Sequence, residues 1–180
     1  MENDIKKISV TKEQIDEICQ RLGSEISRDY VGKTPLIIGL LKGCQPFMSD
    51  LVRNITIPCN LEYMKVSSYR GTESTGIVTV KGEMPNVKDR EIIIIDDILD
   101  SGRTLDSIRQ LLFNNKAKSV ELCVLLDKPE GRVVDIQAKY IGSLVPNEFV
   151  VGYGLDYNEF YRNLPYIGVL KEEIYTKEEN

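Results

Sequence analysis

The chain has 180 residues, 42% of them hydrophobic, which is enough apolar material for the core of one domain spanning residues 1–180. Its formal net charge is −5 and no run of lysine or arginine occurs, so electrostatics give no support to binding of nucleic acid or of an anionic membrane. The sequence contains no histidine, which excludes Ser-His-Asp and Cys-His catalysis and every zinc site with a histidine ligand.

The cysteines and the first residues bear on where the protein acts. Scattered cysteines without Cys-x-x-Cys spacing are typical of reduced, mostly buried thiols rather than of disulfides or zinc ligands. The N-terminal stretch lacks the apolar core of a secretory signal, and no apolar run approaches the length of a bilayer span. We therefore expect a cytoplasmic protein with no membrane partner. The cysteines are Cys19, Cys44, Cys59 and Cys123.

The first predicted element is an amphipathic helix from Thr11 to about Arg28. Thr11 and Gln14 have the form of a capping box, and apolar residues follow at helical intervals. Nothing in this segment indicates chemistry, so we expect it to be a supporting helix.

A buried strand is expected next, over residues 35–41, and it ends in Lys42 and Gly43. A Lys-Gly pair after a strand is typical of a plain turn. It also suits a site in which one cation and a glycine backbone N–H meet an anion. A short helix is predicted beyond it, from the spacing of apolar residues over 47–52.

Two further strands are predicted over residues 61–68 and 77–80, from partial alternation in the first and β-branched residues in the second. The segment between them is small, polar and bounded by glycine. Its composition favours an exposed hairpin loop, and the same composition suits a mobile lid over a site.

Residues 92–105 carry the strongest chemical signal. Four consecutive isoleucines, typical of a strand buried on both faces, run into the carboxylates Asp96, Asp97 and Asp100. A single aspartate there would most simply end the strand or cap a helix. Three within five positions favour a site, because crowded carboxylates repel one another unless a cation or hydroxyl groups fill the gap.

The residues after these carboxylates predict a turn and a helix N-terminus, since small and polar residues precede a segment with helical spacing of leucine and isoleucine. Backbone N–H groups at a helix start can hold a phosphate, and carboxylates can accept hydrogen bonds from sugar hydroxyls or a hydrated metal. The stretch therefore predicts a site for a phosphorylated sugar. The turn residues are Ser101, Gly102, Arg103 and Thr104.

The remaining elements complete an alternation of strand and helix. A strand over 119–126 is followed by a Pro- and Gly-containing turn with Lys128, a strand-like segment spans 149–154, and the charged tail from Lys171 is expected to fray. Alternation predicts an α/β fold with a parallel sheet, whose ligands bind at the carboxyl ends of the strands. We therefore expect the acidic turn, the Lys-Gly pair and Lys128 to converge on one rim.

Residues 92–105 resemble the signature by which type I phosphoribosyltransferases bind phosphoribosyl diphosphate (PRPP): a hydrophobic strand, two acidic residues, two apolar residues, then Asp-Ser/Thr-Gly-X-Thr. The spacing is not that of a Walker P-loop. The family usually has Glu-Asp where this chain has Asp96 and Asp97, a change that shortens one side chain by a methylene and keeps its charge. Leu41-Lys42-Gly43 matches the diphosphate loop of the purine members, in which the Leu-Lys peptide is often cis.

A second segment, residues 146–165, is similar to the base-binding end of hypoxanthine-guanine phosphoribosyltransferases. The resemblance implies an α/β type I phosphoribosyltransferase fold, with a parallel central sheet flanked by helices, a small hood and a flexible lid loop. It implies purine salvage with Mg²⁺ as cofactor: PRPP and hypoxanthine or guanine give IMP or GMP and diphosphate. It also implies a homo-oligomer, dimer or tetramer. The alternatives are a non-catalytic regulator of the same fold, or a xanthine-preferring enzyme.

The same resemblance implies roles for residues that, taken alone, are a core phenylalanine, a turn lysine and surface charges. With no histidine present, Asp100 is the candidate general base. Asp96, Asp97, Asp100, Ser101, Gly102, Arg103 and Thr104 would bind the ribose and 5′-phosphate, and Lys42, Gly43 and Arg162 the diphosphate. Lys128, Phe149 and Val150 would bind the purine, Ser68 and Tyr69 would belong to the lid, and Asp96, Asp97 and Asp156 would hold magnesium.

Overall fold

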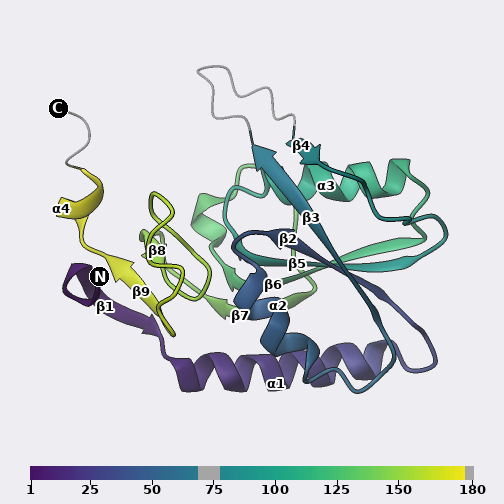
Figure 1. Ribbon diagram of the computed structural model, residues 1–180, viewed down its shortest axis with the longest axis horizontal. Coiled ribbons are helices and arrows are strands. Elements are labelled where there is room, and N and C mark those ends of the chain that lie inside the picture. The colour runs from purple at the N-terminus through teal and green to yellow at the C-terminus, as the bar shows by residue number, and fades with distance from the viewer. Residues whose placement is uncertain (69–77, 177–180) are drawn as a thin grey trace.

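The computed structural model describes residues 1–68 and 78–176, and within them the strands form two sheets (Figure 1). The larger sheet contains β2 (Leu36–Leu41), β3 (Asn60–Ser68), β4 (Val78–Lys81), β5 (Glu91–Leu99), β6 (Ser119–Asp127) and β7 (Tyr140–Leu144). The smaller contains β1 (Ile5–Val10), β8 (Val150–Val151) and β9 (Ile167–Leu170). The helices are α1 (Lys12–Asp29), α2 (Gln45–Val52), α3 (Arg103–Asn114) and α4 (Glu172–Tyr175), with 3₁₀ turns η1 (Glu2–Asp4) and η2 (Pro129–Gly131).

The larger sheet has the strand order β4-β3-β2-β5-β6-β7. All its neighbouring pairs are parallel except β3 with β4. This confirms the predicted α/β class with a mostly parallel central sheet. Each predicted strand over 35–41, 61–68, 77–80 and 119–126 lies within one or two residues of an observed one.

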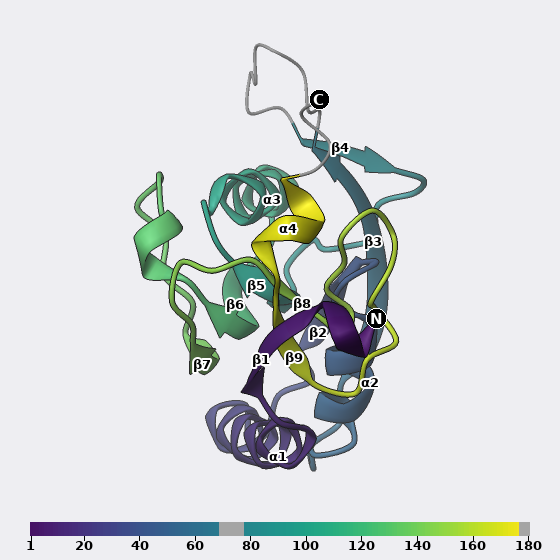
Figure 2. The same cartoon turned by 90° about the vertical axis from the view of Figure 1, so that its left-hand side faces the viewer.

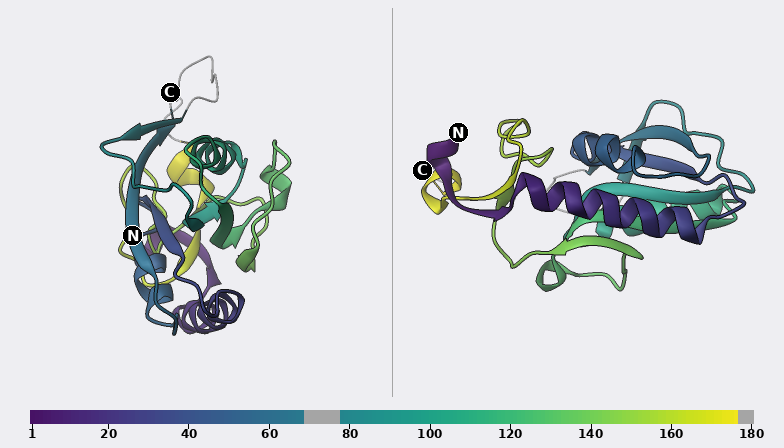
Figure 3. Two further views of the ribbon diagram at one scale, coloured as in Figure 1. Left: turned by 90° about the vertical axis from the view of Figure 1, so that its right-hand side faces the viewer. Right: turned by 90° about the horizontal axis from the view of Figure 1, so that it is seen from below.

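Helices cover both faces of this sheet, which is why its central strand is apolar without alternation. Ile93 and Ile95 of β5 pack in one buried cluster with α1 and α2, whereas Ile92 and Ile94 pack in a second with α3. Figure 2 shows α3 and α1 on opposite sides of the sheet, and Figure 3 shows α1 running along it. The long isoleucine run is thus the expected sequence of a strand buried on both faces.

The first helix begins as predicted. Thr11 is the N-cap of α1, its hydroxyl accepts a hydrogen bond from the backbone N–H of Gln14, and the Gln14 side chain accepts one from the Thr11 N–H. This reciprocal capping box satisfies two N–H groups that a helix start otherwise leaves unpaired.

The strand order reverses direction between β2 and β5, and this positions the site. From β2 the chain proceeds outward to β3, whereas from β5 it proceeds the other way to β6 and β7. The β2–β5 pairing ends at Gly39 and Ile95, after which Leu41 stays beside β3 while Asp96 pairs with Val124 of β6. In open α/β sheets a crevice forms at such a switch point, beyond the carboxyl ends of the strands.

The smaller sheet differs from the sequence-based prediction in one respect. A strand was expected over residues 149–154, but β8 ends at Val151 because Gly152, Tyr153 and Gly154 adopt positive φ angles of 101°, 46° and 102°. A left-handed backbone cannot continue a strand. The chain instead forms a loop that lies close to the rim of the larger sheet (Figure 1).

The C-terminal tail and the cysteines can be compared with what the sequence predicts. The tail from Lys171 does not simply fray, since Glu172–Tyr175 form α4. Across the described ranges the cysteine thiols are unpaired and mostly buried, as expected. None of the helices that the structure places is both long and apolar enough to cross a bilayer.

Candidate active site

The carboxylates Asp96 and Asp97 lie inside β5, so the expected acidic turn starts later than the sequence suggests. The strand continues to Leu99 because it keeps pairing with β6 through Asp127. Burial raises the pKa of both carboxyl groups, and for Asp96 the negative charge of Asp97 raises it further. Two half-buried carboxylates on consecutive residues destabilise the fold, because they repel each other and are partly removed from water. A cation or a ligand with hydroxyl groups would compensate both effects.

Asp100 sits in the turn after β5 and fits closely against η2. A Cβ atom added to Gly131 would lie 1.8 Å from Asp100 Oδ1, so only glycine leaves room for this carboxylate. Lys128 Nζ lies 3.2 Å from Asp100 Oδ2, and the lysine side chain is only 12% exposed. The sequence predicts that Lys128 contacts the purine. In this structure Lys128 is instead paired with Asp100, the candidate general base.

Arg132 holds the Asp100 turn and was not predicted. Its guanidinium donates to the backbone carbonyls of Asp100 at 2.9 Å, Leu99 at 3.2 Å and Ile136 at 2.5 Å, and it forms an ion pair with the Asp127 carboxylate. Arg132 and Asp127 are both largely buried. In the sequence Arg132 is one arginine in a loop. No motif or periodic pattern around it predicts that its side chain contacts the end of β5.

The turn from Asp100 leads into α3 through a glycine in the left-handed conformation. Gly102 is the N-cap with φ 82°, and as a glycine it has no side chain to cap the helix. Arg103 is the first residue of α3, and Ser101 Oγ accepts a 3.4 Å hydrogen bond from its N–H. Backbone N–H groups at a helix start suit an anion. A cavity of about 220 Å³ lies here, lined by Asp96, Asp97, Ile98, Leu99, Asp100, Ser101, Gly102, Thr104 and Leu105.

The Lys42-Gly43 turn packs directly against β5, and the Leu41-Lys42 peptide is cis. A Cβ atom at Gly43 would lie 1.8 Å from Asp97 Oδ2, and one at Gly154 would lie 2.0 Å from the Gly43 carbonyl oxygen. Glycine at both positions lets three backbone segments approach one another. The prediction that this turn joins the acidic strand is confirmed.

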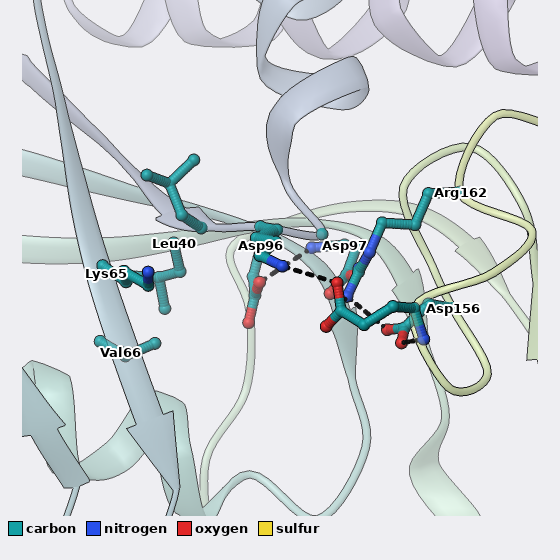
Figure 4. A pocket seen from close by; sticks show the side chains of 11 residues that line it. Leu40, Lys65, Val66, Asp96, Asp97, Asp156 and Arg162 are labelled. Carbon is teal, nitrogen blue, oxygen red and sulfur yellow. Dashed lines mark hydrogen bonds and ion pairs between the residues drawn. The ribbon is translucent and has the colours of Figure 1, made fainter.

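Opposing charges surround Arg162 at the same rim (Figure 4). Arg162 Nη2 lies 2.8 Å from Asp156 Oδ1 and 3.3 Å from Glu159 Oε1, and Lys42 Nζ lies 2.6 Å from Glu159 Oε2. The hydrogen bond from Lys42 and the charge of Arg162 lower the pKa of Glu159. Arg162 Nε is buried without a hydrogen-bond partner among the described residues, whereas Nη2 meets the carboxylates of Asp156 and Glu159.

The predicted groups line three hollows that share residues. The hollow at α3 and one of about 370 Å³ beside Lys42 share Asp96 and Asp97. The latter shares Asp156, Glu159 and Arg162 with a third of about 490 Å³ beside Phe149. The rim is thus continuous from the α3 N-terminus to the Phe149 ring.

Phe149 and Val150 are at the far end of this rim. Phe149 is 39% exposed and lines the third hollow, whereas Val150 is buried and pairs with Val169 of β9. Ser68 is the last residue of β3, and Tyr69 lies outside the described residues. The structure therefore brings most of the predicted side chains to one edge of the sheet.

The predicted magnesium ligands do not form a closed cage. Asp97 and Asp156 line the same hollow, but in the described part of the chain no three carboxylate or thiol side chains are grouped closely enough to hold a metal alone. Magnesium usually keeps several waters and is held by one or two carboxylates together with substrate oxygens. The donors present fit a Mg²⁺ ion that arrives with a diphosphate-bearing ligand.

Comparisons with known proteins agree with this geometry. Residues 11–158 match the model of the phosphoribosyl transferase domain. A hypoxanthine-guanine phosphoribosyltransferase of Streptococcus pneumoniae is 49% identical over 178 residues, which cover 98% of this chain and 99% of that protein. One of Staphylococcus aureus is likewise 49% identical over 178 residues.

Solved structures give the same result. A hypoxanthine phosphoribosyltransferase of Staphylococcus aureus superposes with a TM-score of 0.93 at 50% identity, covering 97% of this chain and 96% of that one. A hypoxanthine-guanine phosphoribosyltransferase of Bacillus anthracis superposes with a TM-score of 0.85 at 38% identity, covering 93% and 99%. The chain therefore belongs to the phosphoribosyl transferase domain family.

Proposed function

We propose that this protein transfers the 5-phosphoribosyl group of PRPP to hypoxanthine or guanine, giving IMP or GMP and diphosphate. The observation that supports it is the continuous rim, in which the α3 N-terminus, a carboxylate pair, two cations and an exposed aromatic ring follow one another. This sequence of groups matches 5′-phosphate, ribose hydroxyls, diphosphate and purine. The whole-chain similarity to purine phosphoribosyltransferases supports the choice of base.

The phosphoribosyl half of the substrate fits the end of β5. The N–H groups of the α3 start, with Ser101 and Thr104, receive the 5′-phosphate. Asp96 and Asp97 accept hydrogen bonds from the ribose hydroxyls. Burial raises the pKa of both carboxyl groups by disfavouring their charged form, and hydrogen bonds from the hydroxyl groups would compensate that desolvation.

The diphosphate fits between Lys42, Gly43 and Arg162. Displacement at the anomeric carbon builds positive character on the sugar and negative charge on the departing diphosphate, which these cations stabilise. Mg²⁺, when bound with PRPP by Asp96, Asp97 and Asp156, adds further neutralisation of the diphosphate. Arg162 lines the same hollow as Lys42 and Gly43, so its guanidinium would hold the leaving group.

The purine loses a proton from its imidazole nitrogen as it attacks, and Asp100 is placed to accept it. Its carboxylate is 47% exposed at the rim, and Lys128 Nζ lies 3.2 Å from one of its oxygens. By its match to the family, Lys128 would contact an exocyclic oxygen of the purine. Phe149 offers its ring for stacking, and backbone groups of Val150 offer hydrogen bonds to the base edge.

The proposal is tested by steady-state assays with PRPP, Mg²⁺ and each base in turn. Turnover is expected with hypoxanthine and guanine, with IMP and GMP as products. No turnover with any purine would overturn the proposal, and a preference for xanthine would reassign the base.

We further propose that the protein forms a homo-oligomer. Large apolar side chains stay exposed on β3, where Leu61 is 46% and Tyr63 44% exposed. These residues are two apart, so they lie on the same side of the strand. Exposed apolar side chains gathered on one face favour contact with a second copy.

Removal of divalent metal is expected to abolish turnover without unfolding the protein. The reason is that the described residues contain no closed metal cage, so the ion enters with PRPP rather than stabilising the fold. Excess EDTA should stop product formation while the melting temperature stays unchanged, and added Mg²⁺ should restore the rate. A lower melting temperature in EDTA would indicate a structural metal instead.

Glu159→Gln is expected to lower both the KM for PRPP and the inhibition constant of diphosphate by about 2- to 5-fold. Glu159 pairs with Lys42 and Arg162, so its carboxylate must leave them before a diphosphate binds. The matched control is Glu17→Gln, which removes the same charge from the exposed face of α1. Equal constants in wild type and Glu159→Gln would show that Glu159 does not compete with diphosphate.

A further inference from the structure

The C-terminal turn α4 contacts the ring that we assign to purine stacking. Tyr175 and Phe149 have ring centroids 5.1 Å apart and an interplanar angle of 23°, a stacked arrangement. Tyr157 meets Phe149 edge-on, with centroids 5.7 Å apart and an angle of 89°. Phe149 is therefore held by two tyrosines, one from the rim loop and one from the tail.

The tail is anchored where it leaves β9. The Lys171 N–H donates to the Asp4 carbonyl at 2.9 Å, and Lys171 Nζ donates to the Asn3 carbonyl at 2.7 Å. Tyr175 packs against an apolar cluster together with Ile174. Figure 1 shows α4 continuing from β9 on the same side of the molecule as β8. These contacts fix the start of α4 and so limit where the Tyr175 ring can lie. The buried members of that cluster are Val151, Tyr161, Leu164 and Leu170.

Tyr175 lies outside the hollow that Phe149 faces. That hollow, of about 490 Å³, is lined by Phe149, Asp156, Tyr157, Asn158, Glu159 and Arg162. Phe149 is nevertheless 39% exposed, which leaves ring surface open for a ligand. A planar ligand in the hollow would thus have Phe149 between itself and Tyr175.

We propose that Tyr175 is a positioning residue for the purine base, which it orients by stacking on Phe149 from behind. This rests on the proposed function, because it assumes that a purine occupies the Phe149 hollow. Loss of the tyrosine ring frees Phe149 to tilt, and the base then loses its stacking partner in the bound geometry. Aromatic pairs of this kind change binding by about 2- to 10-fold beyond the area that they bury.

The test compares Tyr175→Ala, Tyr175→Leu and Tyr175→Phe in steady-state assays with guanine, with Glu173→Gln on the same exposed turn as control. The expected result is a KM for guanine raised about 2- to 10-fold in the Ala and Leu variants, an unchanged KM for PRPP, and wild-type constants in the Phe variant. If Tyr175→Ala melts at a lower temperature than the wild type, its KM also reflects lost stability. Tyr175→Leu keeps an apolar contact, so its KM for guanine then shows whether the aromatic ring is needed. Calorimetric binding of GMP should weaken in the same two variants.

Three results would overturn the inference. An unchanged KM for guanine in the Leu variant would show that the ring does not matter, and a lowered KM would show that Tyr175 occupies the purine position itself. A Phe variant that behaves like the Leu variant would assign the effect to the hydroxyl group. A wild-type protein that neither turns over guanine nor binds GMP would instead refute the proposed function.

Discussion

Asp100→Asn lowers kcat by about 10²- to 10⁴-fold while the KM for PRPP stays close to that of the wild type, if Asp100 is the general base. Asparagine keeps the size of the side chain and cannot accept the purine proton. Its amide has nearly the same size as the carboxylate, so it fits the space that Gly131 leaves open. Because Asp96 and Asp97 lie on the strand and not on this turn, the ribose contacts are expected to persist.

The control for this prediction is Asp106→Asn. Asp106 lies in the first turn of α3 and accepts a 2.7 Å hydrogen bond from Gln110, so it tests the loss of a carboxylate from the same helix start. Its kcat should remain within about 2-fold of the wild type, as is usual for an exposed charge. Equal turnover in Asp100→Asn and wild type would remove Asp100 from the base role.

Arg132→Met is expected to lower the free energy of unfolding by about 3–5 kcal/mol, because it leaves the buried Asp127 carboxylate without its cation. The carbonyl groups of Leu99 and Asp100 lose their donor at the same time. The Asp100 turn is then free to shift, and a displacement of about 1 Å is enough to lower kcat about 10²-fold. Chemical denaturation and steady-state kinetics measure the two effects.

A second substitution separates stability from catalysis. Replacing a buried ion pair by apolar residues of similar size is often neutral, so Asp127→Leu added to Arg132→Met should restore much of the lost stability. It cannot restore the hydrogen bonds to Leu99 and Asp100, so kcat should stay low. Recovery of kcat along with stability would show that Arg132 acts only through the fold.

The groups that could be predicted from sequence are those whose neighbours along the chain carry the signal. The carboxylates Asp96 and Asp97 lie near the end of a strand, and Asp100 lies between that strand and a helix, so local order predicts their place at the rim. Thr11 was predicted as a helix N-cap for the same reason, since its partner Gln14 is three residues away.

What could not be predicted depends on contacts between distant segments. Arg132 reaches the end of β5 across 33 positions, and Glu159 reaches Lys42 across 117. The strand end at Val151 was missed because the glycines Gly152 and Gly154 were read as part of an apolar strand, although both adopt positive φ angles. Tyr175 was missed because a short charged tail resembles a frayed end, and only its stack on Phe149 distinguishes it.

The pairing of β1 with β9 sets an order in which the protein can be completed during synthesis. All strands of the larger sheet precede residue 145, so β5 and its carboxylates can be in place while the ribosome is still adding residues. β1 has to wait for its antiparallel partner, since Ile5 pairs with Leu170, and Tyr175 follows later still. The residues assigned to the sugar phosphate are thus synthesised before those assigned to the base, and Phe149 gains its contact with Tyr175 only after the last strand has been added.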